Sequence, residues 1–303
     1  MKQGNRRFSF CTPGCCSFRV WILSLASLAG ACLIVSFSIR AASDSKTVAQ
    51  NALSAKEKSA GWKLLFDGKT ASGWRGFRKS DFPTECWAVT DGILKRVKQM
   101  DTSREECGDI VTARQYDNFE FQLDWKIQPG GNSGIKYLVI ENRPADWEQA
   151  YLDYHLLSLK KSGKTEPPER LKPERWKYMS MSFELQLIDD TRNADARSSP
   201  DRITGALYDL MAPTQRSVIS LTDFNTARIV VQGKHVEHWI NGAKVVQFER
   251  EGVDLQKLIA ASKFRHLEKF GTFAKGHVAL QDHNSEVWFR NIKIRELNGQ
   301  GRH

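Results

Sequence analysis

The clearest pattern in the chain is a strict alternation of apolar and polar residues from Phe119 to Ile127. Every odd-numbered position is apolar and every even-numbered position is polar, which is the period of a half-buried β-strand. The run Pro129-Gly130-Gly131 ends this strand. Less regular strands are predicted at residues 62–66, 133–140, 182–188, 205–210, 227–232, 235–240, 245–248, 276–283 and 287–294.

Two places in this strand pattern predict a specific local geometry. Asn241-Gly242 separates two strand segments, and both residues tolerate positive φ, so a tight hairpin is predicted there. In the last segment the phase of alternation changes between residues 287–289 and 292–294. This change indicates a bulge near Arg290-Asn291, or a strand that is covered on both faces.

Helical periodicity is confined mainly to residues 145–161 and 254–270. Residues 160–177 are rich in basic side chains and proline, and they are more typical of a solvated loop than of a lid over a pocket. Many strands, long connections and little βαβ alternation favour an all-β fold. We therefore expect an antiparallel β-sandwich of jelly-roll type, with a few short helices in insertions.

The first 42 residues form a predicted targeting segment. Basic residues, among them Arg6, Arg7 and Arg19, precede an uncharged run from Val20 to Ile39, which is the order of an export signal. The run is close to the ~20 residues that can span a bilayer, so a membrane tether through residues 20–39 is the alternative to cleavage. Either would place the folded part outside the cytoplasm, as a periplasmic, extracellular or membrane-anchored protein.

The rest of the chain divides into three predicted parts. Residues 43–60 form a linker or a short helix, residues 61–297 a single β-sandwich domain, and residues 298–303 a C-terminal tail. Of six cysteines, only Cys86 and Cys107 lie in the domain. In an oxidising compartment these two can pair, and two buried thiols are the alternative.

The charge of the chain argues against a nucleic-acid partner. The formal net charge is +10, and five of these charges come from residues 1–42, which hold no acidic residue. What remains is a mildly basic domain without a recognition helix or an RNP-type motif.

Three strand segments carry polar side chains opposite an apolar face: residues 132–139, 183–189 and 276–283. Their polar faces hold Asn132 and Lys136, Glu184 and Gln186, and Gln281 and His283, respectively. If the three strands are neighbours, these side chains gather on one face of one sheet. Amide, imidazole, carboxylate and ammonium groups together can bind sugar hydroxyls, hold a carbonyl and move a proton.

The same alternation makes predictions for the neighbouring positions. Val139 is expected to face the core together with Ile135 and Tyr137. Asp282 is expected to fall on the face opposite Gln281 and to secure a turn.

Several of these residues also have ordinary structural explanations. Glu184 in mid-strand can be a solvated surface residue, and Lys136 can extend its charge to solvent. His238 alternates with apolar neighbours and is predicted to be a core histidine. Tyr208 and Trp74 can pack in the core or stack on a pyranose ring.

No cofactor motif is present in the sequence: there is no HExxH, no P-loop and no dinucleotide fingerprint, and Ser133 lacks the G-x-S-x-G context of a nucleophile. Whether Glu184, Asp189 or His283 binds a divalent metal ion stays an open question, because their spacing specifies no metal site.

Taken together and in order, short motifs along residues 61–297 resemble the 3-keto-disaccharide hydrolase domain family. The matching stretches are Phe66-Asp67-Gly68, Gly73-Trp74, Asn132-Ser133-Gly134-Ile135, Phe183-Glu184-Leu185-Gln186, Gly205-Ala206-Leu207-Tyr208, Asn225-Thr226-Ala227-Arg228, His238-Trp239-Ile240-Asn241-Gly242, Gln281-Asp282-His283 and Phe289-Arg290-Asn291. The chain departs from the family pattern at Lys136-Tyr137, where an apolar residue and an arginine are usual, and in its long segment 142–181.

The resemblance implies a concanavalin-like jelly roll, export, and action on glycosides that are oxidised at C3 of the sugar. A 3-keto group acidifies the C2 hydrogen, so a base can remove it, the aglycone can leave C1 by elimination, and water can add back. On this basis Glu184 and His283 are the acid/base candidates. The expected substrate-binding residues are Asn132, Lys136, Gln186, Gln281 and Tyr208. The alternative is a non-catalytic, lectin-like carbohydrate-binding module on the same fold.

Overall fold

The computed structural model describes residues 49–97, 107–142, 144, 146–162, 165, 168, 171 and 177–298. The predicted export signal or anchor at residues 1–42 lies outside this part of the chain, as does most of the 160–177 segment. Over the residues described, no helix combines the length and the apolar character that crossing a membrane requires.

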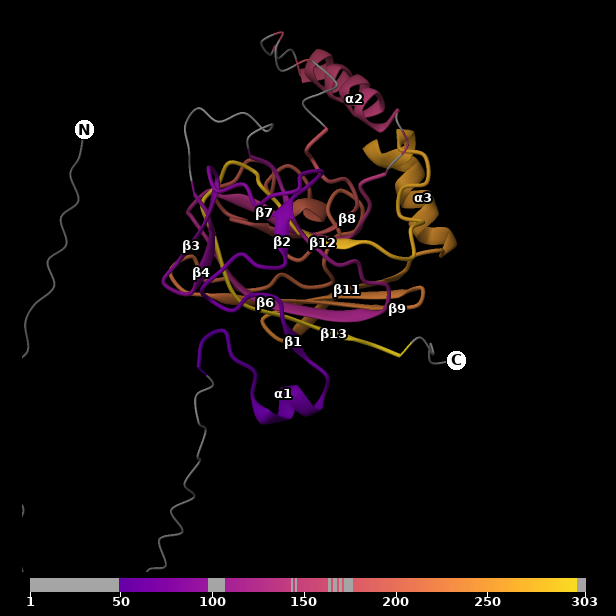
Figure 1. Cartoon of the computed structure of the whole chain (residues 1–303). Coiled ribbons are helices and arrows are strands. Elements are labelled where there is room, and N and C mark those ends of the chain that lie inside the picture. The colour runs from indigo at the N-terminus through magenta and orange to yellow at the C-terminus, as the bar shows by residue number, and fades with distance from the viewer. Residues whose placement is uncertain are drawn as a thin grey trace, which may run out of the picture. The chain divides into compact units, whose positions relative to one another are not determined.

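The fold is built from two antiparallel β-sheets that stack face to face (Figure 1). The larger sheet has eight strands in the order β11-β10-β9-β6-β13-β4-β3, and β1 pairs with the far half of β13. These strands are β1 (Lys63–Leu64), β3 (Trp87–Thr90), β4 (Ile93–Arg96), β6 (Phe119–Ile127), β9 (Asn225–Gln232), β10 (His235–Ile240), β11 (Ala243–Glu249) and β13 (Val287–Glu296).

The smaller sheet has five strands in the order β2-β5-β12-β7-β8. They are β2 (Trp74–Gly76), β5 (Ile110–Thr112), β7 (Asn132–Val139), β8 (Phe183–Ile188) and β12 (His277–Leu280). This architecture confirms the predicted all-β, jelly-roll sandwich.

One apolar core fills the space between the sheets. The alternation in β6 works as predicted, because the odd-numbered residues from Phe119 to Ile127 are all buried in this core. The smaller sheet contributes the apolar sets of its strands, among them Ile135, Leu185 and Leu280. Because this face of the smaller sheet is used for packing, the polar residues of the same strands are left on the opposite face.

One prediction for β7 is wrong. Val139 does not join Ile135 and Tyr137 in the main core but packs in a separate small cluster with Ala279. The cause is a bulge: Leu138 has a positive φ of 55°, and the register with β12 shifts at the same place. Because of the extra residue, the side chains that follow the bulge point to the opposite face of the sheet from the one that the alternation predicts.

Both predicted features of strand geometry are confirmed. Asn241 and Gly242 have φ of 49° and 82° and connect β10 to β11 as a two-residue hairpin turn. The register of β13 with β6 shifts between Arg290 and Lys293, and Asn291 has a positive φ of 53°. This bulge lets β13 pair with β4 before it and with β1 after it.

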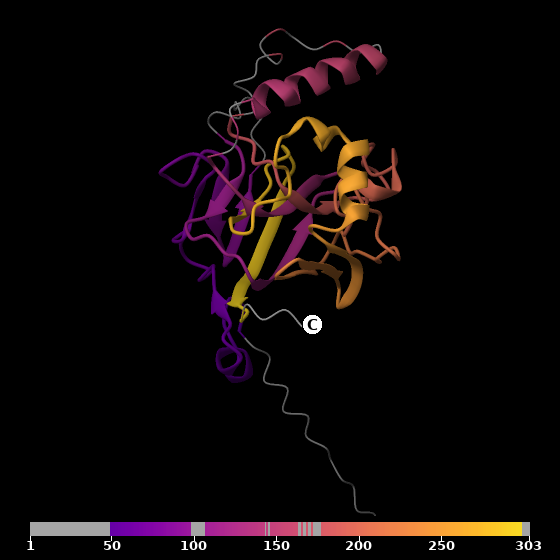
Figure 2. The same ribbon diagram turned by 90° about the vertical axis from the view of Figure 1, so that its right-hand side faces the viewer.

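The helices lie outside the two sheets. They are α1 (Ala55–Ser59), α2 (Trp147–Ser162), α3 (Val253–Ala261) and the 3₁₀ helices η3 (Pro200–Arg202) and η4 (Lys263–His266). Helix α2 lies beyond the smaller sheet, on the side away from the larger one (Figure 1; Figure 2). The helix predicted at 254–270 ends early, because the hydroxyl of Ser262 accepts from the backbone N–H of Phe264 and starts η4.

Residues 205–210, predicted as a strand, form a turn instead. Only Leu207 makes β-bridges, to Leu185 and Met211, and Asp209 has a positive φ of 60°. The apolar residues that suggested a strand are buried by the turn.

Two other predictions concern buried residues. Cys86 and Cys107 form a disulfide, and both residues are buried. His238 is a fully buried core histidine, as predicted, and shares a 2.7 Å hydrogen bond with the Tyr137 hydroxyl.

Candidate active site

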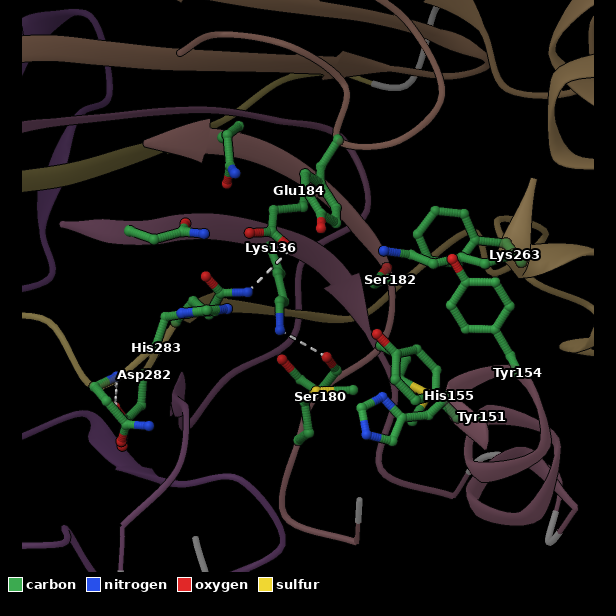
Figure 3. Close-up of a pocket in the computed structure, with 18 residues that line it drawn as sticks. Lys136, Tyr151, Tyr154, His155, Ser180, Ser182, Glu184, Lys263, Asp282 and His283 are labelled. Carbon is green, nitrogen blue, oxygen red and sulfur yellow. Dashed lines mark hydrogen bonds between the residues drawn. The ribbon is translucent and has the colours of Figure 1, made fainter. Parts of the chain in front are cut away.

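A cavity of about 310 Å³ opens on the outer face of the smaller sheet. All seven predicted site residues line it: Asn132, Lys136, Glu184, Gln186, Tyr208, Gln281 and His283. Helix α2 and η4 form the wall that faces the strands (Figure 3). The size falls at the lower end of the range for small-molecule sites, which is about 300–1,000 Å³.

The strands bring these residues together because β8, β7 and β12 are neighbours in that order. Lys136 stands directly opposite Glu184 across the β7–β8 ladder, and Gly134 stands opposite Gln186. Directly paired residues point to the same face of a sheet. The segment after β12 continues along β7, where the Gln281 N–H donates to Gly134 O at 2.9 Å. The predicted juxtaposition of the three strands is therefore present.

Glu184 is the central carboxyl group of the cavity. Its side chain is buried, and burial raises its pKa to about 7 against the opposing effect of the Lys136 charge. The Gln281 amide donates to Glu184 Oε2 at 3.3 Å. A carboxyl with its pKa near neutrality can both take up and release a proton at physiological pH.

Lys136 is held in place by Asp109, a residue that the sequence pattern did not identify. Its Nζ lies 2.9 Å from Asp109 Oδ2 and donates to Ser180 O at 2.8 Å. The Asp109 carboxylate also accepts from the Ser180 hydroxyl at 2.5 Å and from the Asp282 N–H at 2.9 Å. These bonds tie the start of β5, β7 and the 180–182 segment together at the cavity.

Three residues that line the cavity have a buried side-chain amide oxygen without a donor. No described residue donates a hydrogen bond to Asn132 Oδ1, Gln186 Oε1 or Gln281 Oε1, although these atoms are buried. An unpaired buried acceptor costs about 1–3 kcal/mol. Hydroxyl groups of a sugar are donors of the kind that these oxygens lack.

The opposite wall carries Lys263 and a group of aromatic residues. Lys263 Nζ lies 4.2 Å from the centre of the Tyr208 ring and 3.5 Å from Asp209 Oδ2. The Tyr208 hydroxyl donates to Asp195 Oδ2 at 3.0 Å, and substrate binding by Tyr208 stays a prediction. Tyr151 and Tyr154 of α2 also line this wall. Lys263 was not predicted as a site residue, because it fell within the predicted helix 254–270. The capping residue Ser262 is the signal that could have indicated a break before it.

His283 and Glu184 both line the cavity, but His283 is exposed whereas Glu184 is buried. Asp282 was expected on the other face, yet it also borders the cavity. Its carboxylate is buried, pairs with Arg96 Nε at 2.7 Å, and accepts from the Asn284 N–H at 2.9 Å. The second of these bonds secures the turn as predicted.

The described residues contain no group of three or more His, Cys, Asp or Glu side chains arranged to hold a metal ion. Asp189, one of the residues considered for a metal, lies outside the set that lines the cavity. Its carboxylate accepts from the backbone N–H groups of Gly130, Thr191 and Arg192 and so fixes a turn.

A β-sandwich with a buried carboxyl group in a polar cavity is the kind of site that carbohydrate-active proteins use. The sequence of this chain belongs to the 3-keto-alpha-glucoside-1,2-lyase-like domain family, whose model matches residues 61–295. The resemblance read from the motifs is thereby confirmed.

Individual relatives agree with this family. A 3-keto-disaccharide hydrolase of Bacteroides thetaiotaomicron is 30% identical over 253 residues, which are 78% of this chain and 79% of the relative. A crystal structure of a candidate glycosyl hydrolase from Parabacteroides distasonis superposes with a TM-score of 0.62 at 29% identity, covering 82% of this chain and 100% of the other. A second one from that organism gives 0.51 at 25% identity, with coverage of 78% and 99%. These relatives support a carbohydrate-active, glycosidase-like enzyme.

Proposed function

We propose that the protein cleaves 3-keto-glycosides by elimination and hydration, with Glu184 as the base. The observation that carries this proposal is the setting of Glu184: a buried carboxyl group with a pKa of about 7, beside Lys136 and three amide oxygens that lack donors. A weakly acidic carbon–hydrogen bond needs a base whose pKa is near the working pH. The family membership supports a 3-keto-sugar as the substrate.

The reaction begins when ionised Glu184 takes the hydrogen from C2 of the sugar. The electron pair of that bond forms the C1=C2 double bond, and the bond from C1 to the glycosidic oxygen breaks. Water then adds to C1, and protonated Glu184 returns a proton to C2, so that the net reaction is hydrolysis. Lys136 supplies positive charge next to the base, where the oxygen of the 3-keto group gains negative charge.

Three of the remaining predicted residues bind the sugar in this scheme. Asn132, Gln186 and Gln281 accept hydrogen bonds from sugar hydroxyls through their unpaired oxygens. His283, the other acid/base candidate, is exposed, so we assign it a part in the later step in which water adds. Its replacement by asparagine is therefore expected to slow the reaction less than a change at Glu184.

The test is turnover of a 3-keto-glucoside by wild type and by Glu184→Gln, which keeps the shape of the side chain but cannot act as a base. Turnover should fall about 10²–10⁴-fold, while binding of the sugar, measured by calorimetry, should remain. Full turnover by the variant would overturn the proposal. A wild-type protein that binds glycans and releases no aglycone would instead be a carbohydrate-binding module.

We also propose that the protein is exported through residues 1–42. The disulfide between Cys86 and Cys107 supports this, because such bonds persist mainly in oxidising compartments. Cell fractionation and the mass of the mature N-terminus test the proposal. A shortened N-terminus indicates a cleaved signal, and an intact one in the membrane fraction indicates a tether through residues 20–39. Reduced, full-length protein in the cytosol would contradict export.

A further inference from the structure

Lys263 presents a positive charge to the cavity from the wall opposite the strands. The residue is 9% exposed and comes from η4, whereas Glu184 and Lys136 come from the sheet. Figure 3 shows its amino group directed toward the centre of the cavity, with Tyr154 beside it. The charges of Lys136 and Lys263, which belong to different elements, both act on the pKa of the Glu184 carboxyl group and oppose the effect of its burial.

The position of Lys263 is coupled to the position of Glu184 through a turn. The backbone N–H of Tyr208 donates to the carbonyl oxygen of Glu184 at 3.0 Å, and the Tyr208 ring carries Lys263 Nζ on its face. Asp209 follows directly, and its carboxylate is shared between Lys263 and Arg202. The distance between the base and the cation is thus set by a short chain of fixed contacts.

Lys263 stays charged and keeps the capacity to donate. Burial alone would lower its pKa, but the interactions with Tyr151, Tyr208 and Asp209 outweigh burial and raise it. A lysine of this kind neither acts as a base nor gives up its proton readily. Its ion pair with Asp209 is 3.5 Å long, compared with about 2.7–2.9 Å for a strong charge-assisted hydrogen bond. The ammonium group can therefore still bind an oxygen atom of a ligand.

The chemistry of the proposed reaction needs positive charge on both sides of the base. The carbon that loses its hydrogen, C2, lies between C3, which carries the keto oxygen, and C1, which carries the leaving oxygen. Lys136 lies on the strand side, together with the amide oxygens that suit sugar hydroxyls. Lys263 lies on the side walled by tyrosine rings and Phe264, which suits the flat face of a leaving group.

We propose that Lys263 is a further catalytic residue that donates a hydrogen bond from Nζ to the glycosidic oxygen as its bond to C1 breaks. This inference rests on the proposed function. The oxygen departs with the electron pair of the C1–O bond, Lys263 stabilises its negative charge, and water supplies the proton that it finally takes up. Lys263 keeps its own proton throughout, and the wall of α2 and η4 binds the leaving group.

A series of aryl 3-keto-glucosides tests this assignment, with phenol leaving groups that range from weakly to strongly acidic. Poor leaving groups carry the most negative charge on oxygen and depend most on stabilisation. Lys263→Met should therefore lower kcat about 10²–10³-fold for the least acidic phenol and much less for the most acidic one. Lys263→Arg should retain most of the wild-type dependence, and the exposed Lys257→Met is the matched control with unchanged rates.

The same experiment separates a role at the leaving oxygen from other roles. An equal loss for every phenol would mean that Lys263 acts on the keto oxygen or only on the structure, and no loss would mean that it has no role. Either result overturns the inference. Exchange of the C2 hydrogen with deuterium oxide distinguishes this failure from that of the proposed function. This exchange should persist in Lys263→Met and disappear in Glu184→Gln. If exchange persisted in Glu184→Gln, Glu184 would not be the base.

Variants are compared only after thermal unfolding has shown that they fold. Lys263→Met is expected to fold, because Asp209 keeps its bonds to Arg202 in the variant. If it does not fold, Lys263→Arg and Lys263→Gln carry the comparison. Lys263→Gln removes the charge but keeps a donor, so it should show the steeper dependence on phenol acidity, and an unchanged dependence would overturn the inference.

Discussion

Gly134 leaves the space that the carboxyl group of Glu184 occupies. A Cβ atom built on Gly134 would lie 2.0 Å from Glu184 Oε1 and 2.7 Å from its Cδ. The backbone of Gly134 does not need positive φ, so the side chain of its neighbour is what requires glycine here. A glycine within a strand commonly marks such a close approach.

Gly134→Ala is therefore expected to lower activity without unfolding the protein. The added methyl group forces Glu184 to rotate away from its position beside Lys136. A misplacement of about 1 Å can cost about 10²-fold in rate. Turnover of a 3-keto-glucoside and thermal unfolding of the variant check this. Gly233→Ala, at a site where a Cβ atom meets nothing within 4 Å but where φ is +60°, is a control for a general glycine effect. Unchanged turnover by Gly134→Ala would contradict the prediction.

The raised pKa of Glu184 predicts two effects of pH. As a base, Glu184 must be ionised, so kcat/KM should rise with pH up to a pKa of about 7 and level off above it. Stability should change in the opposite direction. Between pH 4.5 and 7 the folded protein keeps Glu184 protonated while the unfolded chain ionises it, so the folded state holds more protons and stability falls as pH rises.

Glu184→Gln removes the cost in stability of burying a carboxyl group that the unfolded chain would ionise. Relative to wild type, the variant should gain stability across pH 4.5 to 7 by an amount on the order of 3 kcal/mol, and keep the gain above pH 7. Urea unfolding of both proteins at a series of pH values measures the difference. A stability difference that does not change with pH would show that Glu184 titrates normally in the folded protein.

Much of the site could be predicted because it is built on regular strands. The period-two alternation placed Glu184 and Gln186 opposite the apolar set of β8, and the same rule placed Asn132 and Lys136 on β7. The rule fails where the backbone departs from regular geometry. The bulge at Leu138 reversed Val139, and the turn at residues 205–210 buries its apolar residues without being a strand.

The partners of the site residues could not be predicted, because their contacts are long-range. Asp109 precedes β5, a strand of only three residues, which is too short to show a period. Its role depends on Lys136 and Ser180, which are 27 and 71 residues away. Lys263 lies in the 3₁₀ helix that follows the capping residue Ser262, and the helical pattern of residues 254–270 did not show this break.

The disulfide should contribute to the stability of the domain. Cys86 and Cys107 are separated by 21 residues in the sequence. Closing a loop of this length stabilises a protein by ~3 kcal/mol, mainly through the unfolded state. The double variant Cys86→Ser and Cys107→Ser should unfold at correspondingly lower urea concentration. Reduced wild-type protein should behave in the same way, and equal stability of reduced and oxidised protein would contradict the prediction.

Asp109 is expected to be the most sensitive position beneath the cavity. Asp109 and Lys136 are 1% and 3% exposed, and the carboxylate accepts hydrogen bonds from Lys136, Ser180 and Asp282. Asp109→Asn leaves the buried ammonium of Lys136 without its counter-charge. It also replaces one acceptor oxygen by an NH2 group, which is a donor, in a place where the surrounding groups donate. Breaking such a pair from one side costs about 3–5 kcal/mol.

A double-mutant cycle with Lys136→Met separates the pair from the rest of the network. Once the charge of Lys136 has been removed, Asp109→Asn should cost less, with a coupling free energy of about 0.5–3 kcal/mol from urea unfolding. Some cost should remain, because the bonds to Ser180 and Asp282 do not involve Lys136. Strictly additive effects of the two substitutions would show that the ion pair contributes nothing, and that Asp109 acts only by joining β5 to the segments around it.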